Sequence, residues 1–295
     1  MSWFYLAMIC ALSLALADVY TKKYFCDYSG VDILLVRLGI PGILLLPFTV
    51  YFGISDLPIE FWYYAIVLVP LEIAAMWLYV LAIRDAPLYL TLPYLSFTPV
   101  FNIAVGYIIL NETVDMKGGA GILLVVIGSY LLNLDQFNQS GSGLFAPLTA
   151  IYKLKNSRLM LIAAAIYSLT SVLSKRAMQY SEPAVFGAHY YTLVGMAFLS
   201  IMLFTQPEKL QLIRKRTKAN LVVGSYMAIM IATHFLAIAQ IEAAYMIAVK
   251  RTSVIFGMLL GAWMFKEIAT YQHFTAAILM EFRPECWILL LLNQP

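Results

Sequence analysis

Apolar stretches of about twenty residues recur along the whole chain, and short polar connections separate them. A helix that crosses the hydrocarbon core of a bilayer needs about 20 mostly apolar residues. Each stretch therefore predicts one transmembrane helix. The pattern predicts an all-α membrane protein of about ten transmembrane helices, at 3–21, 31–53, 61–83, 88–110, 118–134, 157–179, 184–205, 220–240, 243–265 and 272–292.

Composition indicates the same class. Of the 295 residues, 62% are hydrophobic and only 12% are charged, whereas soluble domains are about 45–50% apolar and about 25% charged. With so little chain outside the expected spans, no soluble catalytic domain fits, and an enzyme is not predicted. A membrane-embedded enzyme is the alternative from another class, but it would need clustered Asp, Glu or His residues, and the sequence has no such cluster. The net charge of +3 is modest and the basic residues lie between apolar stretches, so no nucleic-acid partner is expected. The three cysteines do not have ligand-like spacing, and we predict neither a metal nor a cofactor.

The two halves of the chain resemble each other. Leu-Ala-Ile at 81–83 recurs at 236–238, a shift of 236 − 81 = 155 residues. Glu112 recurs as Glu267 at the same shift (267 − 112 = 155). Each unit would hold five helices, so the second must be inverted relative to the first. Inverted repeats are a recurring transporter design, because two mirrored halves can expose one site alternately. A duplication that only builds a helical bundle is the alternative.

The repeat divides the chain into two expected units. The first five-helix repeat covers 1–134, a polar linker follows at 135–156, and the second five-helix repeat covers 157–295. The second repeat ends atypically, because three charges and a proline fall within 281–285, inside the expected tenth span. Either this helix is short and poorly inserted, or the sequence is in error there.

Particular residue patterns point to a known family. They are Gly106-x5-Glu112, Gly261-x5-Glu267, the early lysines Lys22 and Lys175, and the fifth-span glycines Gly118, Gly119, Gly121 and Gly128. Together with the two five-helix units, they resemble the EamA-type members of the drug/metabolite transporter superfamily. The resemblance covers nearly the whole chain. It implies a permease with alternating access in the inner (plasma) membrane of a bacterium, moving a metabolite, an amino acid or a drug. The resemblance does not decide whether the protein is a monomer or a homodimer.

Lys250 and Arg251 are the first candidates for a substrate site. Lys250 lies about seven residues into the ninth span, roughly 10 Å deep at about 1.5 Å per residue. The pair resembles the ninth-helix Lys-Arg pair of the sugar-phosphate/phosphate antiporters, which binds phosphate. The additional fourth-helix lysine of those relatives has no counterpart in 93–96, so the resemblance implies an anionic substrate without fixing a phosphate. The alternative is a structural ion pair with Glu72 or Glu242.

The other candidates each have two interpretations. Glu72, in the third span, either binds substrate and couples transport to protons, since burial disfavours its charged form, or makes a structural hydrogen bond to a tyrosine. Arg37 either contributes to the substrate site or extends to the interface. Asp18 either takes part in coupling or forms an i,i+4 pair with Lys22. Tyr94 either lines a cavity or anchors the protein at the interface.

Two prolines predict an irregular fourth span. Pro93 and Pro99 each remove a backbone donor, so we expect a kink or a break there. The positions 155 residues later hold Ala248 and Val254, and no break is predicted in the ninth span. Glu112, at the end of the fourth span, is expected to bond the backbone of the turn that follows.

Overall fold

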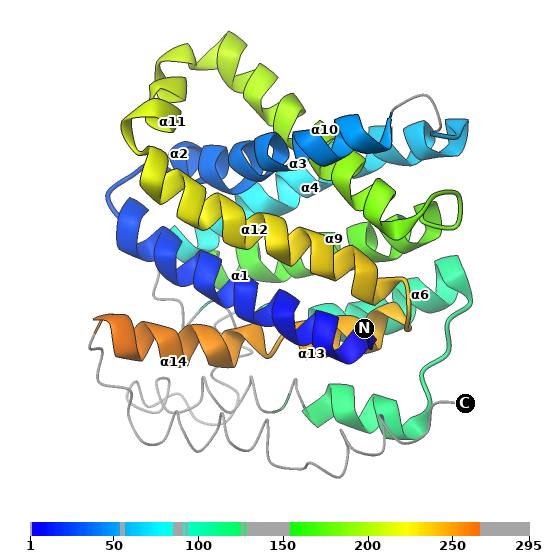
Figure 1. Ribbon diagram of the computed structural model, residues 1–295. Helices are drawn as coiled ribbons and strands as arrows, with labels where there is room; N and C mark the ends of the chain where they lie inside the picture. Colours follow the sequence, from blue (N-terminus) through cyan, green and yellow to red (C-terminus); the bar gives the residue numbers. More distant parts are fainter. Residues whose placement is uncertain are drawn as a thin grey trace.

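The computed structural model describes residues 2–53, 57–84, 91, 94–124, 127 and 154–265. Within these ranges the chain forms helices and no strand (Figure 1), so the all-α prediction is confirmed. Seven segments in these ranges are long and apolar enough to cross a membrane. Most of the linker and the expected tenth span lie outside the described residues.

Where both ends are described, the expected spans agree with the helices to within a few residues, whereas the start of the fourth span and the end of the fifth lie outside the described residues. In the first half they are α1 (Trp3–Phe25), the continuous run of α2 (Gly30–Leu34), the π-helix η1 (Leu35–Gly39) and α3 (Ile40–Phe52), then α4 (Ile59–Arg84), α6 (Thr98–Leu110) and a helix at 116–124. In the second half they are α9 (Lys155–Ala177), α10 (Pro183–Thr205), η2 (Pro207–Leu210), α11 (Gln211–Lys215), α12 (Thr217–Ile238), α13 (Ala243–Lys250) and α14 (Ser253–Phe265).

The helices pack in pairs that join the two halves of the chain. Helix α1 packs along α12, and Figure 1 shows these two helices side by side. In the same way α4 packs against α9, and α3 packs against α10. The packed side chains form one large apolar cluster that includes residues from all of these helices. Neither half therefore forms a separate bundle within the described residues.

Both the fourth and the ninth spans are broken near their centres. Residues 96–97 form a turn, and α6 begins at Thr98 with Pro99 in its first turn, so the break predicted in the fourth span is confirmed. The prediction of an unbroken ninth span was wrong, because α13 ends at Lys250 and α14 begins only at Ser253. Here the amide and the hydroxyl of Thr252 both donate to the carbonyl of Val249, at 3.0 and 2.8 Å. A threonine hydroxyl that bonds a nearby carbonyl competes with the helical pattern, so this helix is interrupted without a proline.

Two glycines allow α3 and α10 to cross at backbone contact. A Cβ atom added to Gly42 would lie 2.7 Å from the Cα atom of Gly195, and the reverse distance is also 2.7 Å. Thr49 lies two turns after Gly42 on α3, and Thr192 lies one turn before Gly195 on α10. Their hydroxyl oxygens are 2.8 Å apart. Helices in a bilayer gain little from excluding lipid, so close approach at small residues and hydrogen bonds between helices hold them together.

We therefore predict that Gly42→Ala and Gly195→Ala each destabilise the fold by about 1–3 kcal/mol, the usual cost of overpacking. The melting temperature of the purified protein in detergent measures this. Gly119→Ala is the matched control, since a Cβ there would lie 3.9 Å from Val114, an ordinary contact. Equal melting temperatures for Gly195→Ala and Gly119→Ala would show that the crossing tolerates a methyl group.

Candidate functional site

A cavity of about 60 Å³ lies inside the bundle, a volume sufficient for several water molecules. Its wall comes from both halves of the chain. Four of its lining residues are charged, and all four were predicted from the sequence as candidates: Arg37, Glu72, Lys250 and Arg251. The remaining lining residues are Leu14, Met76, Tyr79, Leu95, Tyr167, Thr170, Ser171, Ser174, Tyr190, Tyr191, Met230, Ile231, His234, Phe235 and Ile247.

Glu72 is held in the cavity wall by two tyrosines of α10. It lies on α4, two residues after Pro70, and its residue surface is 5% exposed. The hydroxyl of Tyr191 donates to Glu72 Oε1 at 2.6 Å. The hydroxyl of Tyr190 lies 3.4 Å from Glu72 Oε2 and 3.2 Å from the carbonyl of Leu68, so its one proton is shared. The tyrosine hydrogen bond of the structural interpretation is thus present, and the carboxylate also faces the cavity.

Arg37 lies in the π-helical turn of the second span, and the cause of that turn is close by. Pro41 has no N–H to donate to the carbonyl of Arg37, four residues earlier, and its ring clashes with that carbonyl. The chain widens instead, and the amide of Ile40 donates to the carbonyl of Leu35, five residues back. Such π turns occur frequently at functional sites. Here the turn places a buried guanidinium in the cavity wall.

Asp18 is the counterion of Arg37. Its Oδ1 lies 2.6 Å from Arg37 Nη1, and the two residues are 5% and 1% exposed. The hydroxyl of Thr21 lies 3.5 Å from the same nitrogen, and the guanidinium carbon lies 5.2 Å from the centre of the Tyr79 ring. The interpretation that paired Asp18 with Lys22 was wrong, and so was the one that sent Arg37 to the interface. A buried guanidinium attracts the carboxylate more strongly than a lysine that can reach water.

Lys250 and Arg251 lie at the break of the ninth span, where both line the cavity. The Nζ atom of Lys250 lies 3.4 Å from Nδ1 of His234 on α12. Arg251 is 3% exposed, and its Nε and Nη1 atoms are buried with no hydrogen-bond partner in the described part of the chain. Within the described residues, neither cation forms an ion pair with Glu72 or Glu242, contrary to the structural alternative. Arg251 thus places a buried positive charge at the cavity, and its Nε and Nη1 groups are donors without an acceptor among the described residues.

Two of the sequence candidates do not line the cavity: Asp18, which pairs with Arg37 behind the wall, and Tyr94. Tyr94 is 3% exposed and packs in the large apolar cluster, while the next residue, Leu95, faces the cavity. Conversely, sequence reasoning missed the pair Tyr190 and Tyr191. Two adjacent tyrosines in the middle of an apolar span were the available signal, because a buried hydroxyl needs a hydrogen-bond partner.

A separate group of polar contacts joins three helices at the end of the bundle where α1 begins. Lys175 of α9 forms an ion pair with Glu112, and it also donates to the carbonyl of Ile241 at 2.6 Å. The other carboxylate oxygen of Glu112 accepts from the amide of Ala243, the first residue of α13, at 3.0 Å. Glu112 therefore caps a distant helix, and the expectation that it bonds its own following turn was wrong. Its matching residue Glu267 lies outside the described residues.

The adjacent contact adds a second link to α13. The hydroxyl of Tyr245 donates to Asp115 Oδ1 at 2.6 Å, and the amide of Gly118 donates to the same oxygen at 2.9 Å. These two hydrogen bonds, the tyrosine's first, hold the pKa of the Asp115 carboxyl below its usual range. Gly118 has to be a glycine here, since a Cβ atom would collide with the ring of Tyr245.

Apolar helices packed around a buried, charged cavity define an integral membrane protein. The chain belongs to the EamA-like transporter family, whose family model matches residues 1–134 and 157–281. The protein is therefore a membrane transporter, in contact with lipid and with a small-molecule substrate, and the resemblance to EamA-type transporters is confirmed. This family is not one of enzymes.

One solved crystal structure of a protein has a TM-score of 0.68 to this chain, covering 98% of this chain and 96% of that one at 15% identity. At this identity the likeness shows the fold alone. No curated protein sequence is significantly similar to the chain.

The geometry predicts that Asp18→Asn destabilises the protein by about 3–5 kcal/mol, because it leaves Arg37 buried without a counterion. Thermal unfolding in detergent measures the loss. The double variant Asp18→Asn/Arg37→Met should recover part of it, since the uncompensated charge is then gone. As a control, Asp32→Asn disrupts a partly exposed pair with Lys209 and should cost less than about 1 kcal/mol. An Asp18→Asn variant as stable as Asp32→Asn would rule out the buried pair.

Proposed function

We propose that this protein is a secondary-active transporter of a small anionic metabolite. The observation that carries the proposal is the cavity that gathers Arg37, Glu72, Lys250 and Arg251. Among the residues that the structure describes, two nitrogens of Arg251 have no hydrogen-bond partner. Buried charges inside a bundle are costly, and in membrane proteins they mark substrate and ion pathways. The membrane is proposed to be the inner (plasma) membrane of a bacterium.

Alternating access between two inverted repeats, 1–134 and 157–295, is the proposed mechanism. The two helix breaks support it, because they lie 251 − 96 = 155 residues apart, the shift found in the sequence. Their hydrogen bonds correspond as well: Phe97 donates to Tyr94 as Thr252 donates to Val249, at 3.3 and 3.0 Å.

The glycine crossing gives independent support for the repeats. Gly42 and Gly195 are related by a similar shift, 195 − 42 = 153, and they contact each other. The atoms around them match too, since an added Cβ on Gly42 meets the carbonyl of Tyr191 and one on Gly195 meets the carbonyl of Leu38 (191 − 38 = 153). Two equivalent positions meet in this way where a two-fold axis relates the halves. An axis through this crossing suits a substrate site shared by both halves.

In the proposed site, a carboxylate or phosphate of the substrate completes the environment of Lys250 and Arg251. Arginine contributes a planar fork and lysine a compact charge. A second candidate, an amino-acid or multidrug exporter of the same fold, is favoured by one observation, namely that the carboxylate of Glu72 faces the same cavity. A zwitterion would find a partner for each of its charges there.

Arg251→Lys should weaken the binding of anionic substrates although it keeps the charge, and Lys250→Ala should weaken it as well. Hydrogen bonds to charged groups contribute about 1.5–3 kcal/mol, so we expect a roughly tenfold to hundredfold rise in apparent Kd. A thermal-shift screen of metabolites, with acids and amines side by side, first identifies the ligand. Binding and uptake into liposomes then measure the effect.

Matched controls for these variants are Arg158→Lys and Lys155→Ala, two exposed cations at the start of α9. Neutral compounds should be bound equally by all four variants. A selective loss for zwitterions, with simple acids unaffected, would instead favour the amino-acid exporter. If the site variants fold and transport acids and neutral compounds at wild-type rates, the anion site does not exist.

Glu72 is the proposed coupling residue, because its carboxylate is buried yet faces the cavity and can exchange a proton with it. Glu72→Gln should abolish uptake driven by a pH gradient while sparing substrate exchange, which needs no net proton movement. Flux in liposomes with and without a pH gradient measures both. Glu182→Gln, an exposed carboxylate at the start of α10, is the control. Gradient-driven flux that survives Glu72→Gln would leave the residue a purely structural role.

A further inference from the structure

The connection between α10 and α12 carries a concentrated positive charge at one end of the bundle. Residues 206–218 contain five basic residues and a single acid, Glu208. Four of the basic side chains are exposed, and none of the four forms an ion pair within the described residues. We refer to these four as the basic cluster: Arg214, Lys215, Arg216 and Lys218.

The segment beneath the basic cluster is firmly attached to the rest of the protein. Leu212 of α11 is buried, and the side-chain amide of Asn220 donates to the carbonyls of Leu212 and Ile213 at 2.9 and 3.1 Å. Lys209, the fifth basic residue, donates to the hydroxyl of Ser29 at 2.5 Å and pairs with Asp32 at 3.4 Å. One lysine is therefore used to dock the segment, and the basic cluster is left facing outward.

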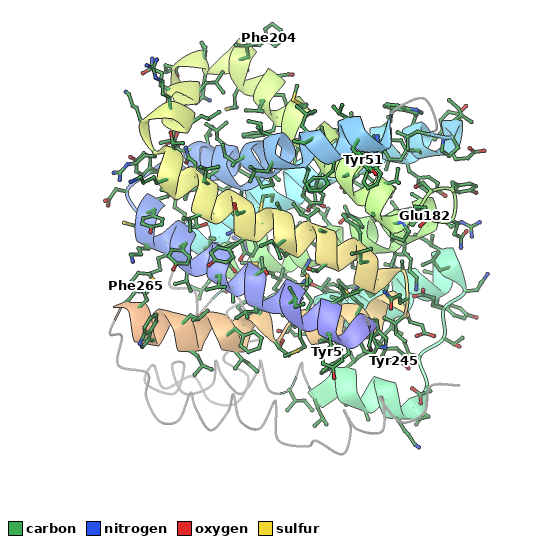
Figure 2. All side chains as sticks on the ribbon, viewed as in Figure 1. Tyr5, Tyr51, Glu182, Phe204, Tyr245 and Phe265 are labelled. Carbon is green, nitrogen blue, oxygen red and sulfur yellow. The ribbon has the colours of Figure 1, made fainter. Side chains whose placement is uncertain are left out.

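Apolar side chains exposed next to this segment indicate the level of the acyl chains. Leu203 and Phe204, at the end of α10, are 56% and 86% exposed, and Figure 2 shows Phe204 at the outer edge of the molecule. On α12, Leu221 is 46% exposed only three residues after Lys218. Charged side chains just beyond such an apolar band lie at the depth of the lipid headgroups. The hydroxyl of Tyr28, which accepts from Arg216 Nε at 2.9 Å, lies at the same end.

We infer that the basic cluster binds the phosphate headgroups of anionic phospholipids, with their acyl chains against the exposed end of α10. Basic residues that follow a membrane helix are attracted to anionic lipid in proportion to their number. Arginine adds paired hydrogen bonds to phosphate oxygens. The bound lipid would join the α10–α12 connection to the loop before α2, because Lys209 and Arg216 reach Ser29 and Tyr28 from the same segment. This inference is independent of the substrate site.

The test compares phosphatidylglycerol with phosphatidylcholine, added to the purified full-length protein in detergent. Lipid occupancy from native mass spectrometry and the shift in melting temperature are measured together. The test variant is Arg214→Gln/Lys215→Gln/Lys218→Gln, which keeps the contact of Arg216 with Tyr28. The control variant is Lys117→Gln/Lys155→Gln/Arg158→Gln, three exposed cations elsewhere on the described surface.

Wild type and control should prefer phosphatidylglycerol, and the test variant should lose about tenfold in apparent affinity for it. High salt should reduce the wild-type preference, since exposed charges are screened. Inorganic phosphate at equal concentration distinguishes a free anion from a lipid and should give little stabilisation. The inference is overturned if the test variant keeps the wild-type preference, or if inorganic phosphate reproduces the full effect. A wild-type preference that salt leaves unchanged would also overturn it, even if the test variant folds poorly.

Discussion

The central constraint on this structure is the cost of holding charge where water does not reach. An unpaired ion inside a membrane bundle is unfavourable by several kcal/mol, and a buried pair is tolerated only if its geometry and hydrogen bonds compensate for lost hydration. Asp18 and Arg37 meet that condition, with a 2.6 Å contact and a tyrosine ring beside the guanidinium. Arg251 does not meet it within the described residues. The protein thus keeps the compensated Arg37 and, among the described residues, the uncompensated Arg251 on the same cavity, and Arg251 is where the proposed anion would bind.

The packing of the helices around the cavity also follows from the lipid environment. In a bilayer there is little hydrophobic gain from bringing helices together, so contact has to come from close approach and from polar bonds between helices. The two glycines of the α3–α10 crossing provide the first, and Glu112 with Lys175 and Ala243 provides the second. Both kinds of contact join the two halves of the chain. The cavity wall can therefore be assembled from side chains more than 150 residues apart in sequence.

The sequence was sufficient for the helices and for most of the charged site. Long apolar runs have few alternatives to a membrane helix, and a charge within such a run is rare enough to be noticed, as with Glu72 and Arg251. The partners of these charges could not be predicted, because they depend on which helices meet. Asp18 pairs with Arg37 rather than with Lys22. Glu112 accepts a hydrogen bond from the first residue of α13, 131 residues away. The break at Arg251–Thr252 was missed because a threonine hydroxyl interrupts a helix only in some contexts, whereas a proline does so in most.

The crossing of Gly42 and Gly195 also has a mechanical consequence. Helices that interdigitate large side chains must lift them out of their grooves before they can turn against each other. Here the two backbones touch directly, so no large side chain lies between α3 and α10 at their point of contact. In the proposed alternating-access mechanism, the crossing would serve as the pivot. A rocking motion of one half against the other would turn about this point, and the cavity wall formed by Arg37 on one helix and Tyr191 on the other would open or close with it.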